Sequence, residues 1–203
     1  MSSYTRVALE NWLKTINVSG SCIDVGGSQN PIRGRTKTWN CDDYKILDLE
    51  QPHECKQKPD IIGDIQNIIW LDELLGGWNY SEDIYKYIGY FNNVFCLEVS
   101  EYWFDPLLAL KNINQLIKDG GLLYISFHFI YPQHNPRGLD YLRYTSAGVE
   151  KLLVEAGFKI LEHIPRRTEV VDLKEVWSAE KMRGWKDFDN SIIGSMVKCR
   201  KKG

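Results

Sequence analysis

The sequence lacks closely spaced cysteines. Its five cysteines are an odd number, are scattered along the chain and include no C-x-x-C pair. A disulfide framework or a zinc site needs paired or clustered ligands, so this pattern predicts reduced thiols and no metal site. The cysteines are Cys22, Cys41, Cys55, Cys96 and Cys199.

Long apolar runs are also missing. No segment approaches the ~20 consecutive apolar residues that a membrane-spanning helix needs. The first residues do not combine a charged region with an apolar run, as a secretory signal would. These absences predict a cytoplasmic protein with no membrane partner.

A strong positive charge is absent as well. The chain carries 25 Lys and Arg against 27 Asp and Glu, for a net charge of −2. Nucleic-acid-binding domains usually present a basic patch. The one basic cluster, at 198–202, lies at the end of the chain and indicates a solvated tail. We therefore expect no nucleic-acid partner.

The chain of 203 residues is long enough to bury a complete core as one domain, 1–203. Its hydrophobic content of 43% and charged content of 26% are ordinary for globular proteins. No internal repeat, low-complexity segment or linker interrupts it. The sequence leaves the oligomeric state, including a homodimer, open.

Apolar periodicity predicts an α/β domain with a mainly parallel sheet, because helical and strand patterns alternate. The predicted helices are Tyr4–Ile16, Trp70–Leu75, Asp105–Ile117 and Thr145–Ala156, with Asn79–Tyr90 helical or irregular. The predicted strands are Ser21–Val25, Tyr44–Leu49, Ile61–Ile65, Asn93–Val99, Leu122–Phe127, Phe158–Ile164 and Ser191–Cys199.

The segment Cys22–Pro31 is the most informative part of the chain. An apolar strand runs into Asp24 and then into the adjacent glycines Gly26 and Gly27. Two glycines without Cβ atoms let the backbone approach a ligand closely. A tight turn without a ligand would show the same residues.

Three carboxylates lie at the ends of predicted strands, at Asp24, Asp48 and Asp64. Ligands of open parallel sheets bind beyond the carboxyl ends of the strands, where these side chains would lie. Asp48 follows Asp24 at about the spacing at which an acidic side chain meets a ribose. The alternative is that each carboxylate caps a neighbouring backbone segment.

The glycines do not form the dinucleotide pattern G-x-G-x-x-G. At the corresponding offsets Gly26 is followed by Ser28 and Pro31. The third glycine of that pattern allows close helix packing under a pyrophosphate. Its absence favours a cofactor without a pyrophosphate over a nicotinamide dinucleotide.

In this order the motifs resemble those of class I S-adenosylmethionine-dependent methyltransferases of the type 11 family. The resemblance covers roughly residues 20 to 160. It is carried by Ile23–Gly27, Ile46–Leu49, Gly63–Ile65, Phe95–Tyr102, Asp105–Leu107 and Lys118–Gly121. It implies a Rossmann-like, doubly wound, seven-stranded and mainly parallel sheet with helices on both faces. The cofactor half would span about 20–100 and the acceptor-side loops about 100–203.

The resemblance also implies how S-adenosyl-L-methionine would bind. Asp24, Gly26, Gly27 and Leu97 would meet the methionine end, and Asp48 would hold the ribose hydroxyls. Leu49 would pack on the adenine, whose amino group would donate to Asp64 beside the backbone of Ile65. The chain departs from the family's glycines at Ser28 and Asn30, and Tyr102 replaces a histidine.

A second stretch, 127–145, follows the fifth predicted strand and should lie over the reacting methyl group. A neutral histidine can remove a proton from a hydroxyl near pH 7, which makes His128 and His134 the candidate catalytic bases. The predicted acceptor-binding residues are Tyr131, Asp140, Tyr141 and Arg143. A loop whose polar side chains only satisfy its own backbone is the plain alternative, and a zinc site at His128, His134 and Asp140 lacks a usual spacing.

These observations predict a methyltransferase that acts on a small polar acceptor, with a hydroxyl of a sugar or glycan precursor as the leading candidate. An N- or protein-directed methyltransferase is one alternative. Another is a non-catalytic scaffold or binding subunit that keeps the fold, because glycines are replaced at positions 28 and 30. The sequence does not predict a role for residues 174–190.

Overall fold

A computed structural model describes residues 4–52, 54–67, 69–72, 77–80, 82–133, 139–167 and 192–203. The elements run in the order α1 (Tyr4–Leu13), β1 (Asn17–Val25), β2 (Thr38–Asp48), β3 (Ile61–Ile62), β4 (Ile69–Asp72), β5 (Gly77–Tyr80), α2 (Glu82–Tyr85), β6 (Phe91–Cys96), the 3₁₀ turn η1 (Ser100–Tyr102), α3 (Pro106–Leu116), β7 (Ile117–His128), α4 (Ser146–Glu155), β8 (Phe158–Arg167) and β9 (Ile192–Lys201).

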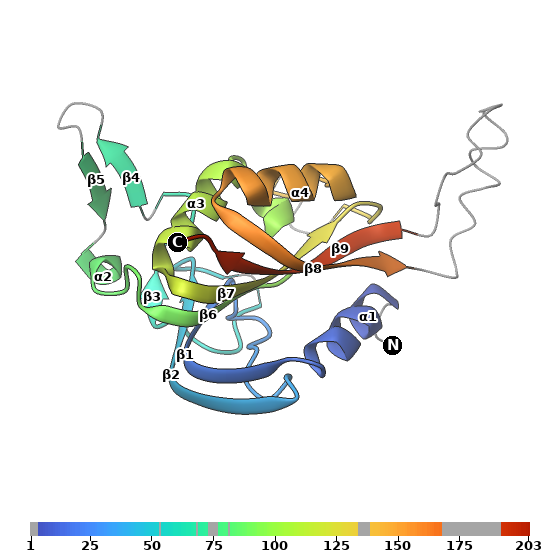
Figure 1. Cartoon of the computed structure of the whole chain (residues 1–203), viewed down its shortest axis with the longest axis horizontal. Helices are drawn as coiled ribbons and strands as arrows, with labels where there is room; N and C mark the ends of the chain where they lie inside the picture. Colours follow the sequence, from blue (N-terminus) through green and yellow to red (C-terminus); the bar gives the residue numbers. More distant parts are fainter. Residues whose placement is uncertain are drawn as a thin grey trace, which may run out of the picture.

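The central sheet has seven strands in the order β3-β2-β1-β6-β7-β9-β8 (Figure 1). Neighbouring strands from β3 through β7 are parallel, and only β9 runs antiparallel to both of its neighbours. This arrangement confirms the predicted doubly wound, mainly parallel sheet. It also brings the carboxyl ends of β1, β2 and β6 to one edge.

Helices cover both faces of the sheet, as predicted (Figure 1). On one face α1 buries Leu9, Trp12 and Leu13 against side chains of the sheet such as Tyr124. On the other face α3 and α4 bury a larger core together with apolar residues of β6 and β7. Asp105 begins α3 by accepting a hydrogen bond from the Leu108 N–H at 2.9 Å, in the usual way of an N-terminal cap.

One prediction about the connections is wrong. Residues 69–72 and 77–80 form the antiparallel strand pair β4–β5, whereas the sequence predicts a helix at 70–75. The segment 70–75 is too short for its apolar pattern to separate strand from helix. In the part of the chain that the structure describes, no helix is long and apolar enough to cross a membrane.

Helix α1 contributes Leu9, Trp12 and Leu13 to the smaller core, and the variant Leu9→Ala tests this packing. Leu9 is 0% exposed, so truncation leaves a cavity and should lower the free energy of unfolding by about 2–5 kcal/mol. Val7 on the same helix is 46% exposed, and Val7→Ala should change that energy by no more than about 0.5 kcal/mol. Urea unfolding of both variants measures the difference, and equal effects would contradict this packing.

Candidate functional site

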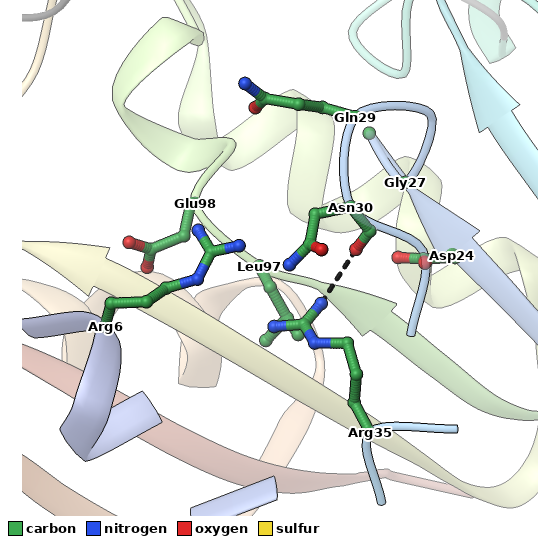
Figure 2. A pocket seen from close by; sticks show the side chains of 9 residues that line it. Arg6, Asp24, Gly27, Gln29, Asn30, Arg35, Leu97 and Glu98 are labelled. Carbon is green, nitrogen blue, oxygen red and sulfur yellow. Dashed lines mark hydrogen bonds between the residues drawn. The ribbon is translucent and has the colours of Figure 1, made fainter. Parts of the chain in front are cut away.

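A pocket opens beside the first glycine turn, at the carboxyl ends of β1 and β6 (Figure 2). Two of its walls come from outside these strands, one from α1 and one from the loop between β1 and β2. Its lining residues are Arg6, Asp24, Gly26, Gly27, Gln29, Asn30, Arg35, Leu97 and Glu98. The pocket therefore brings together the four residues that the sequence predicts at the methionine end of a cofactor.

Asp24 links β1 to the loop that follows the glycine turn and to β2. Its side chain is buried, and Oδ2 accepts hydrogen bonds from the Ile32 N–H at 2.7 Å and the Tyr44 hydroxyl at 3.1 Å. Burial raises the pKa of Asp24 to about 7, although both donors and the charge of Arg35 act in the opposite direction. Near neutral pH this carboxyl group is therefore close to its pKa, and a charged ligand group in the pocket would shift its protonation.

Both glycines of the turn are required by space. Gly26 has φ +75°, and a Cβ there would lie 2.4 Å from Cγ2 of Val99. A Cβ at Gly27 would lie 2.4 Å from Cγ of Asp24. The Gly26 N–H donates to the Leu47 carbonyl at 2.8 Å, which joins the turn to the end of β2. The turn thus presents bare backbone to the pocket.

Asp48 ends β2 but does not line the pocket. Its Oδ2 accepts from the Ser28 N–H at 3.0 Å and its Oδ1 from the Leu49 N–H at 2.8 Å. The side chain of Leu49 is 50% exposed. A carboxylate has about four acceptor positions, so Asp48 can accept further hydrogen bonds while it holds the turn.

The predicted adenine residues lie after β3, also outside the pocket. The Asp64 carboxylate accepts from the Gln66 N–H at 2.9 Å and so closes its own turn. Ile65 is buried, and its carbonyl accepts from Nδ2 of Asn112 at 2.7 Å. The Gln66 side chain accepts from the Phe104 N–H at 2.6 Å, which fixes the loop after β6 against this turn.

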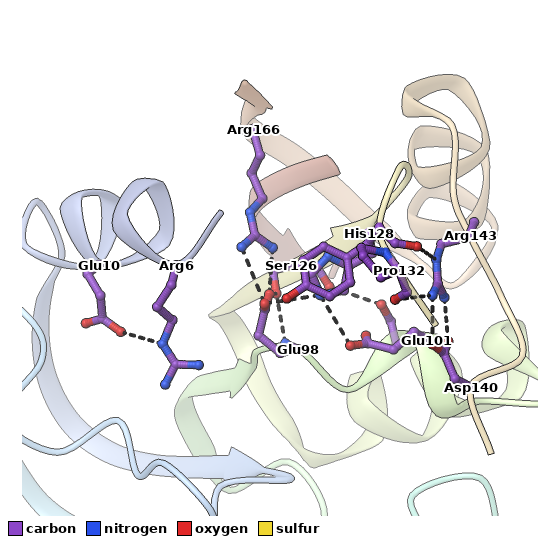
Figure 3. A network of polar contacts seen from close by, with 12 residues as sticks. Arg6, Glu10, Glu98, Glu101, Ser126, His128, Pro132, Asp140, Arg143 and Arg166 are labelled. Atoms are coloured by element: carbon purple, nitrogen blue, oxygen red, sulfur yellow. Dashed lines mark hydrogen bonds and ion pairs between the residues drawn. The ribbon is translucent and has the colours of Figure 1, made fainter. Parts of the chain in front are cut away.

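A largely buried chain of charged side chains continues from the pocket toward the residues that the sequence predicts to bind the acceptor (Figure 3). Glu98 stands at its centre with φ +59°, an uncommon conformation for a residue with a side chain. Its carboxylate meets Arg166 Nη1 at 2.6 Å, the Ser126 hydroxyl at 2.7 Å and His128 Nε2 at 3.1 Å. Burial alone would raise the pKa of Glu98, but His128 and Arg166 lower it well below its usual range.

His128, at the end of β7, lies between two carboxylates. Its Nε2 is 3.1 Å from Glu98 Oε2 and 3.3 Å from Glu101 Oε1, and its side chain is 1% exposed. Burial disfavours the imidazolium, but Glu101 and Glu98 outweigh it and raise the pKa of His128 to about 9. A histidine that is protonated at neutral pH does not suit the neutral base that the sequence predicts here.

The predicted acceptor residues form one ordered group next to His128. Arg143 pairs with both oxygens of Asp140 and donates to the carbonyls of Tyr131 and Pro132. The ring of Tyr131 lies 4.3 Å from that of His128, centroid to centroid. The second candidate base, His134, lies outside the described residues.

The edge of this group carries exposed aromatic rings. Tyr141 is 49% exposed and meets Phe104, which is 83% exposed, edge to face at 6.1 Å. The backbone N–H of Tyr141 donates to the Glu101 carbonyl at 2.8 Å. This hydrogen bond fixes the backbone of Tyr141, and with it the aromatic pair, next to the buried Glu101.

Sequence reasoning missed five charged residues of the site. Glu98 and Glu101 lie at and just after the end of the predicted strand Asn93–Val99. A carboxylate at a strand end is the signal that identifies Asp24 and Asp48, so both residues could have been found in this way. Arg6, Arg35 and Arg166 have no local signal, because only the fold brings their segments to the pocket and its neighbourhood. Within the described ranges, no group of three or more His, Cys, Asp or Glu side chains is placed to hold a metal ion.

No protein-family model matches the sequence, and no curated protein matches it. Solved structures match it closely in shape. An S-adenosylmethionine-dependent methyltransferase from Mesorhizobium loti is 14% identical with a TM-score of 0.60, over 98% of this chain and 99% of that one. The chain has the class I methyltransferase fold.

The same fold occurs in proteins with different activities. Phosphoethanolamine N-methyltransferase 2 from Haemonchus contortus, in complex with S-adenosyl-L-methionine, is 10% identical with a TM-score of 0.57, over 97% of this chain and 52% of that one. The [4+2]-cyclase SpnF is 13% identical with a TM-score of 0.56, over 98% and 80%. At these identities the likeness establishes the methyltransferase fold alone.

The charge on His128 should make stability depend on pH. Its folded pKa of about 9 lies above the ordinary 6.5, so the stabilisation is complete below pH 6.5 and is lost as the pH rises through 9. Relative to His128→Asn, the wild type should lose about 3 kcal/mol of unfolding free energy between pH 6.5 and 9.5. Denaturant unfolding at both pH values measures this loss.

The control is His163→Asn, whose ring contacts Glu150 and Ser195 instead of the buried charges. It should keep the pH dependence of the wild type. If His128→Asn also keeps it, His128 is not held as an imidazolium.

Proposed function

We propose that the chain is an S-adenosylmethionine-dependent methyltransferase acting on a small polar acceptor. The observation that carries this proposal is the pocket at the carboxyl ends of β1 and β6. There Asp24, Gly26 and Gly27 meet Leu97 in the fold that such enzymes share. Ligands of open α/β sheets bind at this edge, so the pocket is in the expected place.

The residues present fit this cofactor better than a dinucleotide. All of residues 26–37 are described and none is helical, so no helix N-terminus is available to bind a pyrophosphate. A Cβ at Gly27 would clash with the side chain of Asp24, so only bare backbone fits at this position beside the pocket. Asp48, Leu49, Asp64 and Ile65 would hold the ribose and adenine. When bound, the cofactor supplies an electrophilic methyl group.

On the acceptor side, Tyr131, Asp140, Tyr141 and Arg143 would bind and orient the acceptor beside the buried charges. An oriented nucleophile gains most of its acceleration from proximity to the methyl group. A hydroxyl acceptor must also release its proton. Because His128 is held as an imidazolium, we assign it to fixing Glu98 and Glu101, and His134 is the proposed base. A sugar or glycan precursor suits the polar character of this group.

A non-catalytic scaffold is the second candidate. It is favoured by the Ser28–Asp48 hydrogen bond, because the carboxylate proposed for the ribose already ties the turn to β2. In that case the turn, with Ser28 and Asn30 at family glycine positions, would have no cofactor to meet. A methyltransferase directed to nitrogen or to a protein side chain would use the same cofactor site with a different acceptor.

Calorimetric titration with S-adenosylhomocysteine tests the cofactor. The wild type should bind with a Kd in the micromolar range, and Asp48→Ala should weaken binding at least about 100-fold, because two charge-assisted hydrogen bonds to the ribose are lost. Asp60→Ala is the matched control. Asp60 also accepts a hydrogen bond from a backbone N–H of β2, that of Ile46 at 2.8 Å. Ile46 lies two residues before the carboxyl end of β2, so this contact is outside the proposed ribose site.

A folded wild type that does not bind would support the scaffold and refute the enzyme. Equal losses of affinity in Asp48→Ala and Asp60→Ala would show that Asp48 only stabilises the backbone and does not contact the ribose. Incubation with methyl-labelled cofactor and a panel of sugars, amines and peptides then identifies the acceptor. Label found only in peptides or amines would refute the hydroxyl acceptor.

A further inference from the structure

Two aromatic rings lie in solvent next to the residues that the sequence predicts to bind the acceptor. Phe104, between η1 and α3, is 83% exposed, more than any other large apolar side chain in the part of the chain that the structure describes. Tyr141 is 49% exposed, and its ring meets that of Phe104 at 86° with the centroids 6.1 Å apart. Adjoining apolar groups at the surface are typical of binding sites, because covering them removes apolar area from water.

The backbone that carries Phe104 is fixed by one side-chain amide. Oε1 of Gln66 accepts hydrogen bonds from the Phe104 N–H at 2.6 Å and the Asp105 N–H at 2.9 Å. Nε2 of Gln66 donates to both carboxylate oxygens of Asp64 at 3.3 Å. The oxygen of this amide thus meets only donors and its nitrogen only acceptors, which determines its orientation. The exposed ring of Phe104 is therefore presented by backbone that is held in place.

Tyr141 is held in a similar way. The Glu101 carbonyl accepts from the backbone N–H of Tyr141 at 2.8 Å and from that of Leu142 at 3.1 Å. On either side of Tyr141, Asp140 and Arg143 form an ion pair that orders the same loop (Figure 3). Rings that are positioned before a ligand arrives lose little conformational freedom when they bind it. We call Phe104 and Tyr141 the aromatic platform.

The two carboxylates next to the aromatic platform along the chain differ in exposure. Asp140, directly before Tyr141, is buried against Arg143 and is not offered to a ligand at the surface. Asp105, directly after Phe104, is exposed, and its Oδ1 caps α3. A carboxylate has about four acceptor positions, so Asp105 can accept further hydrogen bonds while it caps the helix. The platform therefore combines aromatic faces with a hydrogen-bond acceptor at its border.

A saccharide ring matches this combination. One of its faces carries positively polarised C–H groups, which the electron-rich face of an aromatic ring attracts. Its rim carries hydroxyl groups, which can donate to a carboxylate such as that of Asp105. An apolar ring would use the aromatic faces only. A cation would use the faces and the charge, but it would not supply the hydroxyl acceptor proposed above.

We infer that the aromatic platform binds a saccharide ring of the acceptor, which stacks on Phe104 and Tyr141. The inference rests on the proposed function and deepens it, because it names the surface that recognises the acceptor and adds Phe104 to the site. Phe104 and Tyr141 are binding residues in this account. They select the acceptor and take no part in the transfer of the methyl group.

Ligand-observed NMR titration tests the aromatic platform without the need for a known acceptor. The probes are methyl glycosides and disaccharides of hexoses, deoxyhexoses and N-acetylhexosamines, with simple phenols and primary amines as the other two classes. Each titration is run with and without S-adenosylhomocysteine. The wild type should bind saccharides, and Phe104→Ala should weaken that binding about 10-fold, because the stacked ring and its buried area are lost. Phe104→Trp keeps an aromatic face and should stay within about 3-fold of the wild type.

The matched control is Tyr85→Ala. Tyr85 is an aromatic residue of α2 that is 68% exposed, and α2 lies away from α4 and the end of β7 (Figure 1). This variant should bind saccharides like the wild type. The affinity for S-adenosylhomocysteine, measured by calorimetry, should stay within about 2-fold in every variant, because neither Phe104 nor Tyr85 lines the pocket beside the glycine turn. Since Phe104 is exposed, its truncation leaves the core intact.

Each other outcome refutes one specific claim. Unchanged saccharide binding in Phe104→Ala, or an equal loss in Tyr85→Ala, would overturn the aromatic platform. Binding of phenols or amines without saccharides, or of no probe at all, would overturn the saccharide assignment. A wild type that binds S-adenosylhomocysteine but no saccharide would refute only this inference. A wild type that binds saccharides through Phe104 but not S-adenosylhomocysteine would refute the proposed function and leave a saccharide-binding scaffold.

Discussion

The ion pairs of the partly buried Glu98 carboxylate are the interactions on which both halves of the site depend. It lines the pocket at the end of β6 and at the same time pairs with Arg166 of β8 and His128 of β7. Arg166 and His128 are buried, and buried charges need paired partners, so removal of Glu98 would take a counter-charge away from each of them. Through these pairs Glu98, which has φ +59°, joins the segment after β6 to the ends of β7 and β8. The proposed cofactor and acceptor sides thus meet at one residue.

Much of the fold could be predicted because the buried strands and the packed helices leave clear patterns. The run Asn93–Val99 and the helical stripe at 105–117 correspond to β6 and α3, and the positions of all seven strands of the sheet were recognised. The hairpin β4–β5 was not, because a short apolar segment fits a strand as well as a helix. The first half of β2, from Thr38, was missed. It lies near the edge of the sheet, and its exposed residues alternate with half-buried ones, so it has no continuous apolar run.

The site was predictable only where a residue lies at or just after the end of a strand. Asp24, Gly26, Gly27 and Leu97 could be assigned in this way, and the structure brings them into one pocket. Residues such as Arg6 and Arg166 come from a helix and a strand that only the folded topology brings near the turn. The protonation of His128 depends on two carboxylates that surround it in the fold. A sequence pattern can therefore identify a candidate histidine but cannot tell whether it is a base.

The most direct test of the account is hydrogen exchange of the backbone amides with and without S-adenosylhomocysteine. The account predicts slower exchange at residues 24–35, 48–49, 64–65 and 97–98, and also in α1 around Arg6. Residues of α4, which pack on the opposite face, should not change. Protection confined to other parts of the sheet, or no protection at saturating ligand, would contradict the assignment of this pocket to the cofactor.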